Sequence, residues 1–338
     1  MMKESLRILH CANFSESKYG QVFYSIDRKI SNGLIRNGHF VYDFSYREIA
    51  KNLAFFKRKK LGAKKMNEKL IQTVQNIQPD LLLLGHSELV YSDTLRFIRE
   101  NYPTIKIAMW WVDPFDKIDH IDERLPYLDA FFATTSPEYY KHKFLNKTNF
   151  YFLPNICDNS IETLKSYESD NFDYDLIFIG RKDEKRKDFI EKLSNLEKLD
   201  FKVFGDSKDN LIFGQNFLNT ISKSRMTINY SRYNDIPLYS SDRIIQLLAQ
   251  GTLVFCPRIP EYESLFSDNE IVYFNDFSDL EKKIYYFKKN DKERIEISKN
   301  ACERAHKEFN STRVTKFMLK LVFPVDYLED NYLIKGKV

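Results

Sequence analysis

The chain has 338 residues, which is more than one compact core usually contains, so two domains are expected. Hydrophobic residues make up 43% of the chain and charged residues 30%, a balance that excludes an intrinsically disordered protein. The net charge of +4 is small and both signs are interspersed, so the composition does not indicate a nucleic-acid-binding protein.

The four cysteines are widely scattered and form no Cys-x-x-Cys pair, which argues against a disulfide framework or a zinc site and favours a reducing compartment. The apolar run near the start is too short for a signal peptide. No window approaches the roughly 20 apolar residues that a membrane span needs. We therefore expect a cytoplasmic protein.

The first half of the chain alternates strand and helix patterns. Apolar runs that predict strands occur at residues 6–11, 39–44, 80–85, 106–112, 130–134 and 150–153. Helical patterns occur at residues 21–36, 48–77, 92–101, 122–128 and 137–144, the second of them broken near Gly62. This alternation predicts a parallel sheet with right-handed crossovers.

The same alternation returns after a polar, irregular segment at residues 155–172, which is interpreted as a linker. Strands are predicted at residues 174–180, 201–205, 226–230, 252–255 and 271–274, and helices at residues 184–199, 215–224, 240–250, 278–290, 291–309 and 311–322. The fold class is therefore α/β, with two Rossmann-like, doubly wound domains at residues 1–154 and 173–310 that face a central cleft.

Gly180 and Arg181 directly follow the first strand of the second domain. Ligands of doubly wound sheets bind beyond the carboxyl ends of the strands, where glycine admits a phosphate and arginine donates to it. Both are thus candidates for binding a diphosphate. Three further cations, Lys182, Lys185 and Arg186, lie among acidic residues and are interpreted as a solvated helix start.

A second group of candidates surrounds the helix that stops at Gly251. Ser241 and Arg243 begin this helix, where a cation is mildly opposed by the helix dipole, so a bound anion is predicted as the partner of Arg243. Tyr230 ends the preceding strand and is placed to stack on a base, although a half-buried structural tyrosine is the alternative.

Polar residues also follow the strands of the first domain. Asp113 and Asp116 come just after a strand, so either carboxylate is placed to act as a general base on an acceptor hydroxyl, or simply to cap a turn. His86 closes another strand in the same way and is a second catalytic candidate. Asn13 and Tyr19, in the loop after the first strand, are candidates for acceptor binding together with Asp116. Metal ligation has little support, because no histidine lies at ligand spacing from the two aspartates.

The segment Lys57–Lys65 places six cations in nine positions, directly after Phe56. Such a basic segment suits peripheral contact with an anionic membrane surface or an acidic acceptor, while a solvated helix face is the commoner alternative. The whole chain contains no Walker motif, GxSxG elbow or GxGxxG fingerprint, so ATPase, serine hydrolase and NAD enzyme functions lose their usual support.

Six motifs in order, WWVDPFD, DAFFATT, YFLPNICD, YDLIFIGR, SRMTINYSR and SSDRIIQLLAQGTLVF, resemble the CgeB-like glycosyltransferases, which are named for a spore-maturation protein. The resemblance covers about residues 80–320 and implies two Rossmann-like domains of the GT-B type. The C-terminal part also resembles the group-one glycosyltransferase C-terminal domain, whose final helix returns to the first domain. Residues 311–338 would contain that helix.

The resemblance implies metal-free transfer of a sugar from a nucleotide-activated donor, with no further cofactor. The donor would bind through Gly180, Arg181, Tyr230 and Arg243, and Asp113 would be the catalytic carboxylate. One departure concerns Gln246, which stands where the family commonly has a glutamate that holds the donor ribose. A glutamine still offers an amide to the ribose hydroxyls, but no charge-assisted hydrogen bond.

The leading hypothesis is therefore a glycosyltransferase that acts on a glycan, lipid-linked or protein acceptor. Gln246 motivates the alternative, a non-catalytic protein that binds a sugar nucleotide or a glycan and regulates or scaffolds an assembly. A third hypothesis, nucleic-acid binding through Lys57–Lys65, predicts steeply salt-dependent binding, and the interleaved acidic residues elsewhere argue against it.

Overall fold

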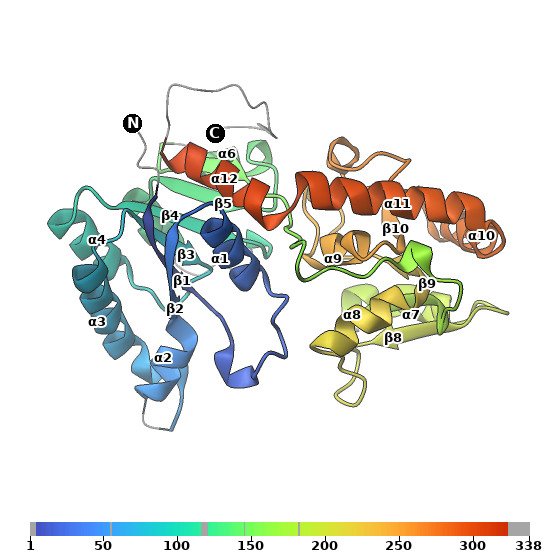
Figure 1. Ribbon diagram of the computed structural model, residues 1–338, viewed down its shortest axis with the longest axis horizontal. Helices are drawn as coiled ribbons and strands as arrows, with labels where there is room; N and C mark the ends of the chain where they lie inside the picture. Colours follow the sequence, from blue (N-terminus) through green and yellow to red (C-terminus); the bar gives the residue numbers. More distant parts are fainter. Residues whose placement is uncertain (1–4, 55, 116–120, 145, 182, 324–338) are drawn as a thin grey trace. The chain divides into compact units, whose positions relative to one another are not determined.

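The computed structural model describes residues 5–54, 56–115, 121–144, 146–181 and 183–323 (Figure 1). Contacts divide the chain into two units. Unit 1 runs to Ile156 and resumes at Ser311, and unit 2 is Cys157–Asn310. Each unit contains one sheet whose strands are all parallel, so the predicted α/β class with two Rossmann-like sheets is confirmed.

The sheet of unit 1 has the strand order β2-β1-β3-β4-β5-β6. Its strands are β1 (Arg7–Ala12), β2 (Phe40–Ser45), β3 (Leu81–Gly85), β4 (Lys106–Trp111), β5 (Ala130–Ala133) and β6 (Asn149–Phe152). Strand β3 is buried at every position, because helices cover both faces of this sheet. The order reverses between β1 and β3, since the chain first adds β2 on one side and then returns to the other.

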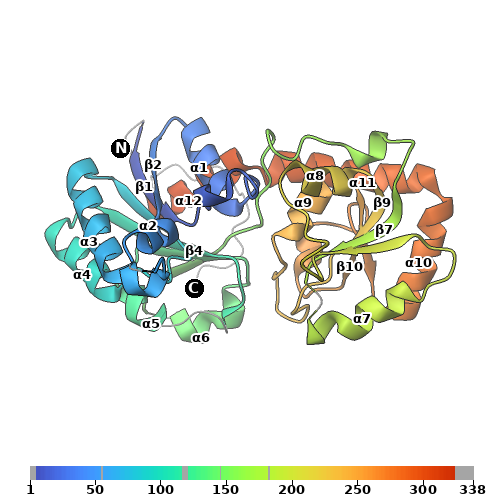
Figure 2. The same ribbon diagram turned by 90° about the horizontal axis from the view of Figure 1, so that it is seen from below.

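Alternate residues of these strands enter two separate cores. Leu9, Leu82 and Met109 pack under one set of helices: α2 (Tyr46–Asn52), α3 (Lys59–Ile77), α4 (Ser92–Asn101), α5 (Ile121–Arg124) and α6 (Lys141–Phe144). Ile8 and Leu83 face the other way, toward α1 (Ile26–Arg36) and α12 (Ser311–Val322). Figures 1 and 2 show these two sets of helices on opposite sides of the sheet. Short 3₁₀ turns are η1 (Glu16–Lys18), η3 (Leu125–Tyr127) and η4 (Glu138–Tyr140).

Helix α12 is the last described helix of the chain, and it completes unit 1. A Cβ atom on Gly33 of α1 would lie 2.2 Å from the carbonyl oxygen of Ser311. The absence of a side chain at Gly33 therefore allows α12 to pack closely against α1. The Asn37 amide donates to the carbonyl of Thr312 at 2.9 Å, which fixes the end of α1 against the start of α12. The bounds of α12 agree with the predicted helix at residues 311–322.

Two local predictions in unit 1 differ from the structure. Helix α1 begins at Ile26 and not at residue 21, because the Ser25 side chain caps it by accepting from the Arg28 backbone N–H. The helical stretch at residues 48–77 is interrupted after Asn52, whereas Gly62 lies inside α3. A Cβ on Gly62 would lie 1.9 Å from the carbonyl oxygen of Ala50, so this glycine allows close packing of α2 on α3.

The sheet of unit 2 has the order β11-β10-β9-β7-β8 and reverses between β7 and β9. Its strands are β7 (Tyr174–Ile179), β8 (Phe201–Phe204), β9 (Ser224–Ile228), β10 (Leu253–Pro257) and β11 (Val272–Phe274). Helices α7 (Glu184–Ser194) and α10 (Phe277–Lys289) cover one face, and α8 (Gln215–Ser222), α9 (Arg243–Ala249) and α11 (Asp291–Glu308) lie on the other (Figure 2). The 3₁₀ turns here are η5 (Ser166–Glu168) and η6 (Tyr262–Ser264).

Residues 157–172, predicted as a linker, belong to unit 2. The Ser166 backbone N–H donates to the carbonyl of Gln250 at 2.8 Å, and Cys157 donates to the carbonyl of Phe309 at 2.9 Å. This segment lacks a strand or α-helix, but its backbone hydrogen bonds attach it to the end of α9 and the end of α11.

Candidate functional site

Each sheet reverses its strand order once, and ligands of such sheets bind beyond the carboxyl ends of the strands at that point. In unit 2 the segments concerned follow β7 and β9, and in unit 1 they follow β1 and β3. Most of the candidate residues lie on these segments.

Arg243 lies at the start of α9 and extends across the ends of β7 and β9. Its Nη1 donates to the carbonyl of Ile179 at 2.7 Å, and its Nη2 donates to the carbonyl of Tyr230 at 2.9 Å. The guanidinium lies 5.0 Å from the ring centroid of Phe178. Arg243 makes no ion pair with any residue that the structure describes. Backbone carbonyls therefore hold this cation in place, and its charge is not neutralised by a carboxylate.

Arg186 of α7 lies against the same glycine as Arg243. A Cβ on Gly180 would lie 2.8 Å from Nη1 of Arg243 and 3.2 Å from Nη1 of Arg186, so a side chain at this position would have to displace these guanidinium groups. Arg186 is 8% exposed and its guanidinium is 5.7 Å from the Phe178 ring centroid. Two guanidinium groups thus converge on the carboxyl end of β7.

One carboxylate serves this group of cations. Asp183 accepts from Arg186 Nη2 at 2.8 Å and from Arg232 Nε at 3.1 Å. Burial acts to raise the pKa of Asp183, but the hydrogen bonds and charges of the two arginines hold it below its ordinary value. Burial and the nearby charge of Arg186 lower the pKa of Arg243 to about 10, so Arg243 remains a cation at neutral pH. The arginine cluster, defined as Arg186, Arg232 and Arg243 with Asp183, carries a net positive charge.

The other residues predicted to bind the donor also lie in unit 2. Arg181 is exposed directly after Gly180, whereas Lys182 lies outside the described residues. The Tyr230 ring stacks on Phe189 with centroids 4.0 Å apart, so one of its faces is already covered. The Ser241 backbone N–H donates to the Ser231 hydroxyl at 3.1 Å. Gln246 is 6% exposed, and its side-chain amide donates to Asp242 at 2.9 Å.

The two catalytic candidates of unit 1 follow neighbouring strands. His86 comes after β3 and stacks on the Trp111 ring at 4.1 Å. The Val112 backbone N–H donates to its Nε2 at 3.2 Å, and the half-buried Asp113 is the next residue of the chain after Val112. Nε2 of His86 is therefore the unprotonated nitrogen of the neutral ring. Asp116 lies outside the described residues.

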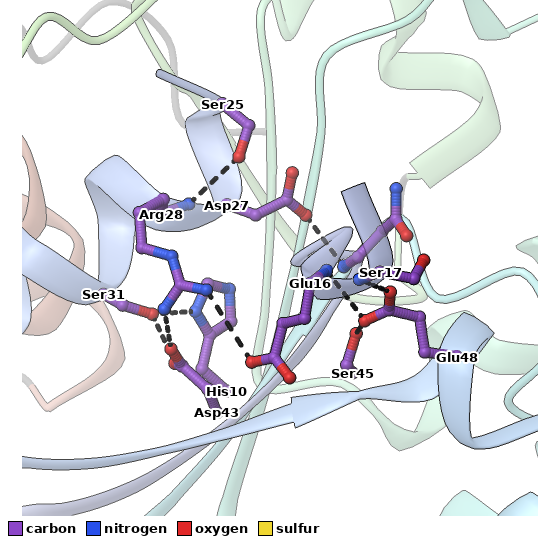
Figure 3. Close-up of polar contacts among 11 residues, drawn as sticks. His10, Glu16, Ser17, Ser25, Asp27, Arg28, Ser31, Asp43, Ser45 and Glu48 are labelled. Carbon is purple, nitrogen blue, oxygen red and sulfur yellow. Dashed lines mark hydrogen bonds and ion pairs between the residues drawn. The ribbon is translucent and has the colours of Figure 1, made fainter. Parts of the chain in front are cut away.

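The loop after β1 carries the two remaining candidates. The Asn13 backbone N–H donates to Asp27 at 3.0 Å, and Tyr19 is 95% exposed. The Glu48 carboxylate holds this loop, because the successive backbone N–H groups of Glu16 and Ser17 donate to it at 3.0 and 2.6 Å. Figure 3 shows Glu48 beneath the turn that contains Glu16 and Ser17.

Beside this loop, a chain of hydrogen bonds starts in the interior of unit 1, and Figure 3 shows its part from His10 to Arg28. Trp110 Nε1 donates to His10 Nε2 at 3.1 Å, so His10 carries its proton on Nδ1 and donates it to the Ser31 hydroxyl at 2.8 Å. Ser31 in turn donates to Asp43 at 2.6 Å, and Asp43 also accepts from Arg28 at 2.8 Å. The chain fixes the neutral tautomer of a fully buried histidine beside the candidate acceptor loop.

This histidine predicts how the stability of the protein depends on pH. Burial, with the nearby charge of Arg28, lowers the pKa of His10 to about 3. The unfolded chain takes up a proton near pH 6.5, but the folded chain does so only near pH 3. His10 therefore contributes stability that is fully present above about pH 6.5 and is lost as the pH falls toward 3, by up to about 1.4 kcal/mol per pH unit.

We expect the unfolding free energy of His10→Gln to fall less steeply with decreasing pH, by about 1.4 kcal/mol per pH unit, when urea unfolding is measured between pH 4 and pH 7. The control is His142→Gln, since His142 is exposed on α6. Equal slopes for His10→Gln and the unaltered protein would contradict the assignment.

Sequence reasoning missed several of these residues. The acidic residues around Arg186 predict a solvated cation, yet Arg186 is buried and pairs with Asp183 three residues earlier. Arg28, Ser31 and Asp43 were not singled out. The spacing of Arg28 and Ser31 on one face of a helix, with Asp43 on an adjoining strand, was the available signal. Among the described residues, no group of three or more His, Cys, Asp or Glu side chains is arranged to hold a metal ion.

Comparisons with known proteins bear on both units. A glycosyl transferase-like family model matches residues 181–320. No curated protein matches the sequence. Within the part of the chain that the structure describes, no helix is both long and apolar enough to cross a bilayer.

Several solved structures are similar over nearly the whole chain. Sucrose-phosphate synthase from Thermosynechococcus elongatus has a TM-score of 0.61 at 13% identity, covering 93% of this chain and 98% of that one. An alpha-glucosyltransferase in complex with UDP and a 13-mer DNA has a TM-score of 0.61 at 13% identity, covering 94% and 100%. Anabaena HepE in complex with UDP-glucose has a TM-score of 0.58 at 11% identity, covering 95% and 100%.

At these identities the solved structures establish the fold alone, and the family model covers the second half of the chain. These matches do not distinguish the CgeB-like subtype from other glycosyltransferases of this fold. The fold is that of the GT-B glycosyltransferases, and together with the family match over residues 181–320 it supports the assignment of this chain as a glycosyltransferase.

Proposed function

We propose that this protein transfers a sugar from a nucleotide-activated donor to a glycan, lipid-linked or protein acceptor, without a bound metal ion, as a CgeB-like glycosyltransferase. The observation that carries the proposal is the arginine cluster after β7 and β9, where Arg186 and Arg243 converge on Gly180 and the carboxylate of Asp183 pairs with Arg186 but not with Arg243. Arginine donates to diphosphates in a fixed planar geometry, and a surplus of positive charge favours a polyanionic ligand.

In this proposal the donor binds to unit 2. Arg181 and Arg243 neutralise the diphosphate beside Gly180, while Tyr230, Ser241 and Gln246 contact the nucleoside. Fixed cations that are already in place stabilise the charge that develops on a leaving nucleoside diphosphate. UDP or UDP-glucose is bound in several of the similar structures, so UDP-glucose is the first donor to test.

The acceptor binds to unit 1. Asp113 removes the proton from the acceptor hydroxyl, the hydroxyl oxygen bonds to the anomeric carbon, and the bond from that carbon to the diphosphate breaks. His86, which accepts from the backbone N–H of Val112, is the second candidate for this base. Asn13, Tyr19 and Asp116 contact the acceptor.

A screen of the full-length protein against sugar nucleotides tests this function. We expect one nucleotide to raise the melting temperature, with a stabilisation of about 2.7 kcal/mol at a hundredfold excess over its Kd. We also expect release of nucleoside diphosphate that is unchanged in excess EDTA. Failure of every sugar nucleotide to bind would overturn the proposal, and loss of turnover in EDTA would overturn metal independence.

A second candidate function is a non-catalytic protein that binds a sugar nucleotide or a glycan. The observation in its favour is Gln246, a neutral residue that is buried and bonded to Asp242. Binding of a sugar nucleotide with neither hydrolysis nor transfer, across a panel of acceptors, would favour this candidate over the enzyme.

A further inference from the structure

The start of α3 presents a surface that the proposed function does not use. Between residues 49 and 67 the chain has seven cations and no acidic residue. We define the basic face as the exposed residues at and before the first two turns of α3: Phe56, Lys57, Arg58, Lys60, Leu61, Lys64 and Lys65. Figure 1 shows α2 and α3 meeting at one end of unit 1, where this segment lies.

The cations of the basic face are not neutralised by the protein. Lys59 pairs with Glu88 at 2.8 Å, but no ion pair joins the five cations of the basic face to any residue that the structure describes. The first turn of α3 contains no acidic residue, so the helix dipole opposes the cations that begin it. An external anionic partner would neutralise these cations and would offset their unfavourable interaction with the helix dipole.

Two large apolar side chains lie among these cations. Phe56 is 78% exposed and Leu61 is 64% exposed. On α3, Leu61 shares its face with Lys64 and Lys65, three and four residues later. The opposite face of the helix, with Met66, Leu70 and Val74, is already buried in the core of unit 1. The exposed phenylalanine and leucine thus add apolar area to the outer surface beside the cations.

We propose that the basic face docks on an anionic phospholipid membrane. A lipid surface offers both features that this face requires, anionic headgroups for the cations and an apolar boundary for Phe56 and Leu61. A nucleic acid would satisfy the cations alone and would leave Leu61 without a role. Only the residues at and just before the first two turns of α3 take part, so the association is peripheral and reversible. The inference is independent of the proposed sugar transfer, because it is read from binding and not from turnover.

Co-sedimentation of the full-length protein with vesicles tests this proposal. We expect binding to phosphatidylcholine vesicles that contain about 30% phosphatidylglycerol, weaker binding at about 0.5 M salt, and little binding to pure phosphatidylcholine. Replacing Lys60, Lys64 and Lys65 together by Glu is expected to weaken binding at least on the order of 100-fold, since the loss of each cation alone costs about fivefold and each new carboxylate is repelled by the anionic surface. Phe56→Ser with Leu61→Ser is expected to weaken binding on the order of tenfold at unchanged charge.

The matched control applies the same change of charge to α11 of unit 2, with Lys292, Lys299 and Lys307 replaced by Glu. This control is expected to bind vesicles like the unaltered protein. Equal binding to neutral and anionic vesicles, or equal loss in the control, would overturn the proposal. So would unchanged vesicle binding in the Phe56→Ser, Leu61→Ser variant together with competition by DNA, which would point to a nucleic-acid surface. Should the triple lysine variant not fold, the apolar variant alone carries the test.

Discussion

Arg243→Ala is expected to reduce sugar transfer on the order of 10²–10³-fold in kcat/KM, the usual loss when one fixed donor to a developing charge is removed. The affinity for the nucleoside diphosphate should fall with it, because the same cation neutralises the bound product. Kinetics with the donor identified in the nucleotide screen, and calorimetry with the corresponding nucleoside diphosphate, measure the two effects.

Arg243 also joins the ends of β7 and β9 through two backbone carbonyls, so the alanine variant is expected to lose about 2 kcal/mol or more of unfolding free energy. Arg243→Lys separates the two roles, since lysine keeps the charge but cannot donate to both carbonyls in a planar geometry. The matched control is Arg225→Ala, at the opposite end of β9, where Arg225 pairs with Asp291. Near-normal transfer by a folded Arg243→Ala protein would remove this residue from the donor site.

Asp113→Asn is expected to lower kcat on the order of 10²–10⁴-fold, because an amide cannot remove the proton of the acceptor hydroxyl. Donor affinity should stay unchanged, since all the residues proposed to hold the donor belong to unit 2. We would measure acceptor-dependent turnover and the Kd of the donor for the same variant. Lower turnover at an unchanged Kd identifies a catalytic base and distinguishes it from a residue that only shapes the turn after β4.

Asp93→Asn serves as the control for Asp113. Asp93 is an exposed aspartate in the first turn of α4 that pairs with Arg96 at 2.9 Å, and its replacement should leave transfer intact. A full rate of acceptor-dependent transfer by Asp113→Asn would show that another group is the base, and His86 would then be the next residue to replace.

The strands were predictable because each one is a short apolar run bounded by turn residues. The run at residues 80–85, for example, became β3, which is buried at every position. The strand order was not predictable, because it depends on which strands pair and not on any local pattern. The misplaced break at Gly62 also comes from a contact between distant residues, since a glycine in a helical pattern indicates either a break or a close contact with another segment. The carbonyl of Ala50, twelve residues earlier, decides between these two possibilities.

The candidate site was predictable where position alone determines it. Gly180, Tyr230, His86 and Asp113 follow parallel strands, and the carboxyl ends of parallel strands share one edge of a sheet. The partners of Arg243 were not predictable, because its carbonyl contacts come from residues 64 and 13 positions away. The sequence predicts a bound anion as the hydrogen-bond partner of this arginine. In the structure Nη1 and Nη2 already donate to backbone carbonyls without an anion.

Helix α12 has a consequence for the synthesis of the chain. Val314, Met318 and Leu319 fill the core of unit 1 beside residues of β1 and α1 that were made some three hundred positions earlier. The ribosome therefore releases all of unit 2 before unit 1 can close, although unit 1 begins first. Until α12 has been synthesised, the nascent amino-terminal half exposes the apolar residues that α12 will cover, and a fragment that stops before Ser311 would expose them permanently.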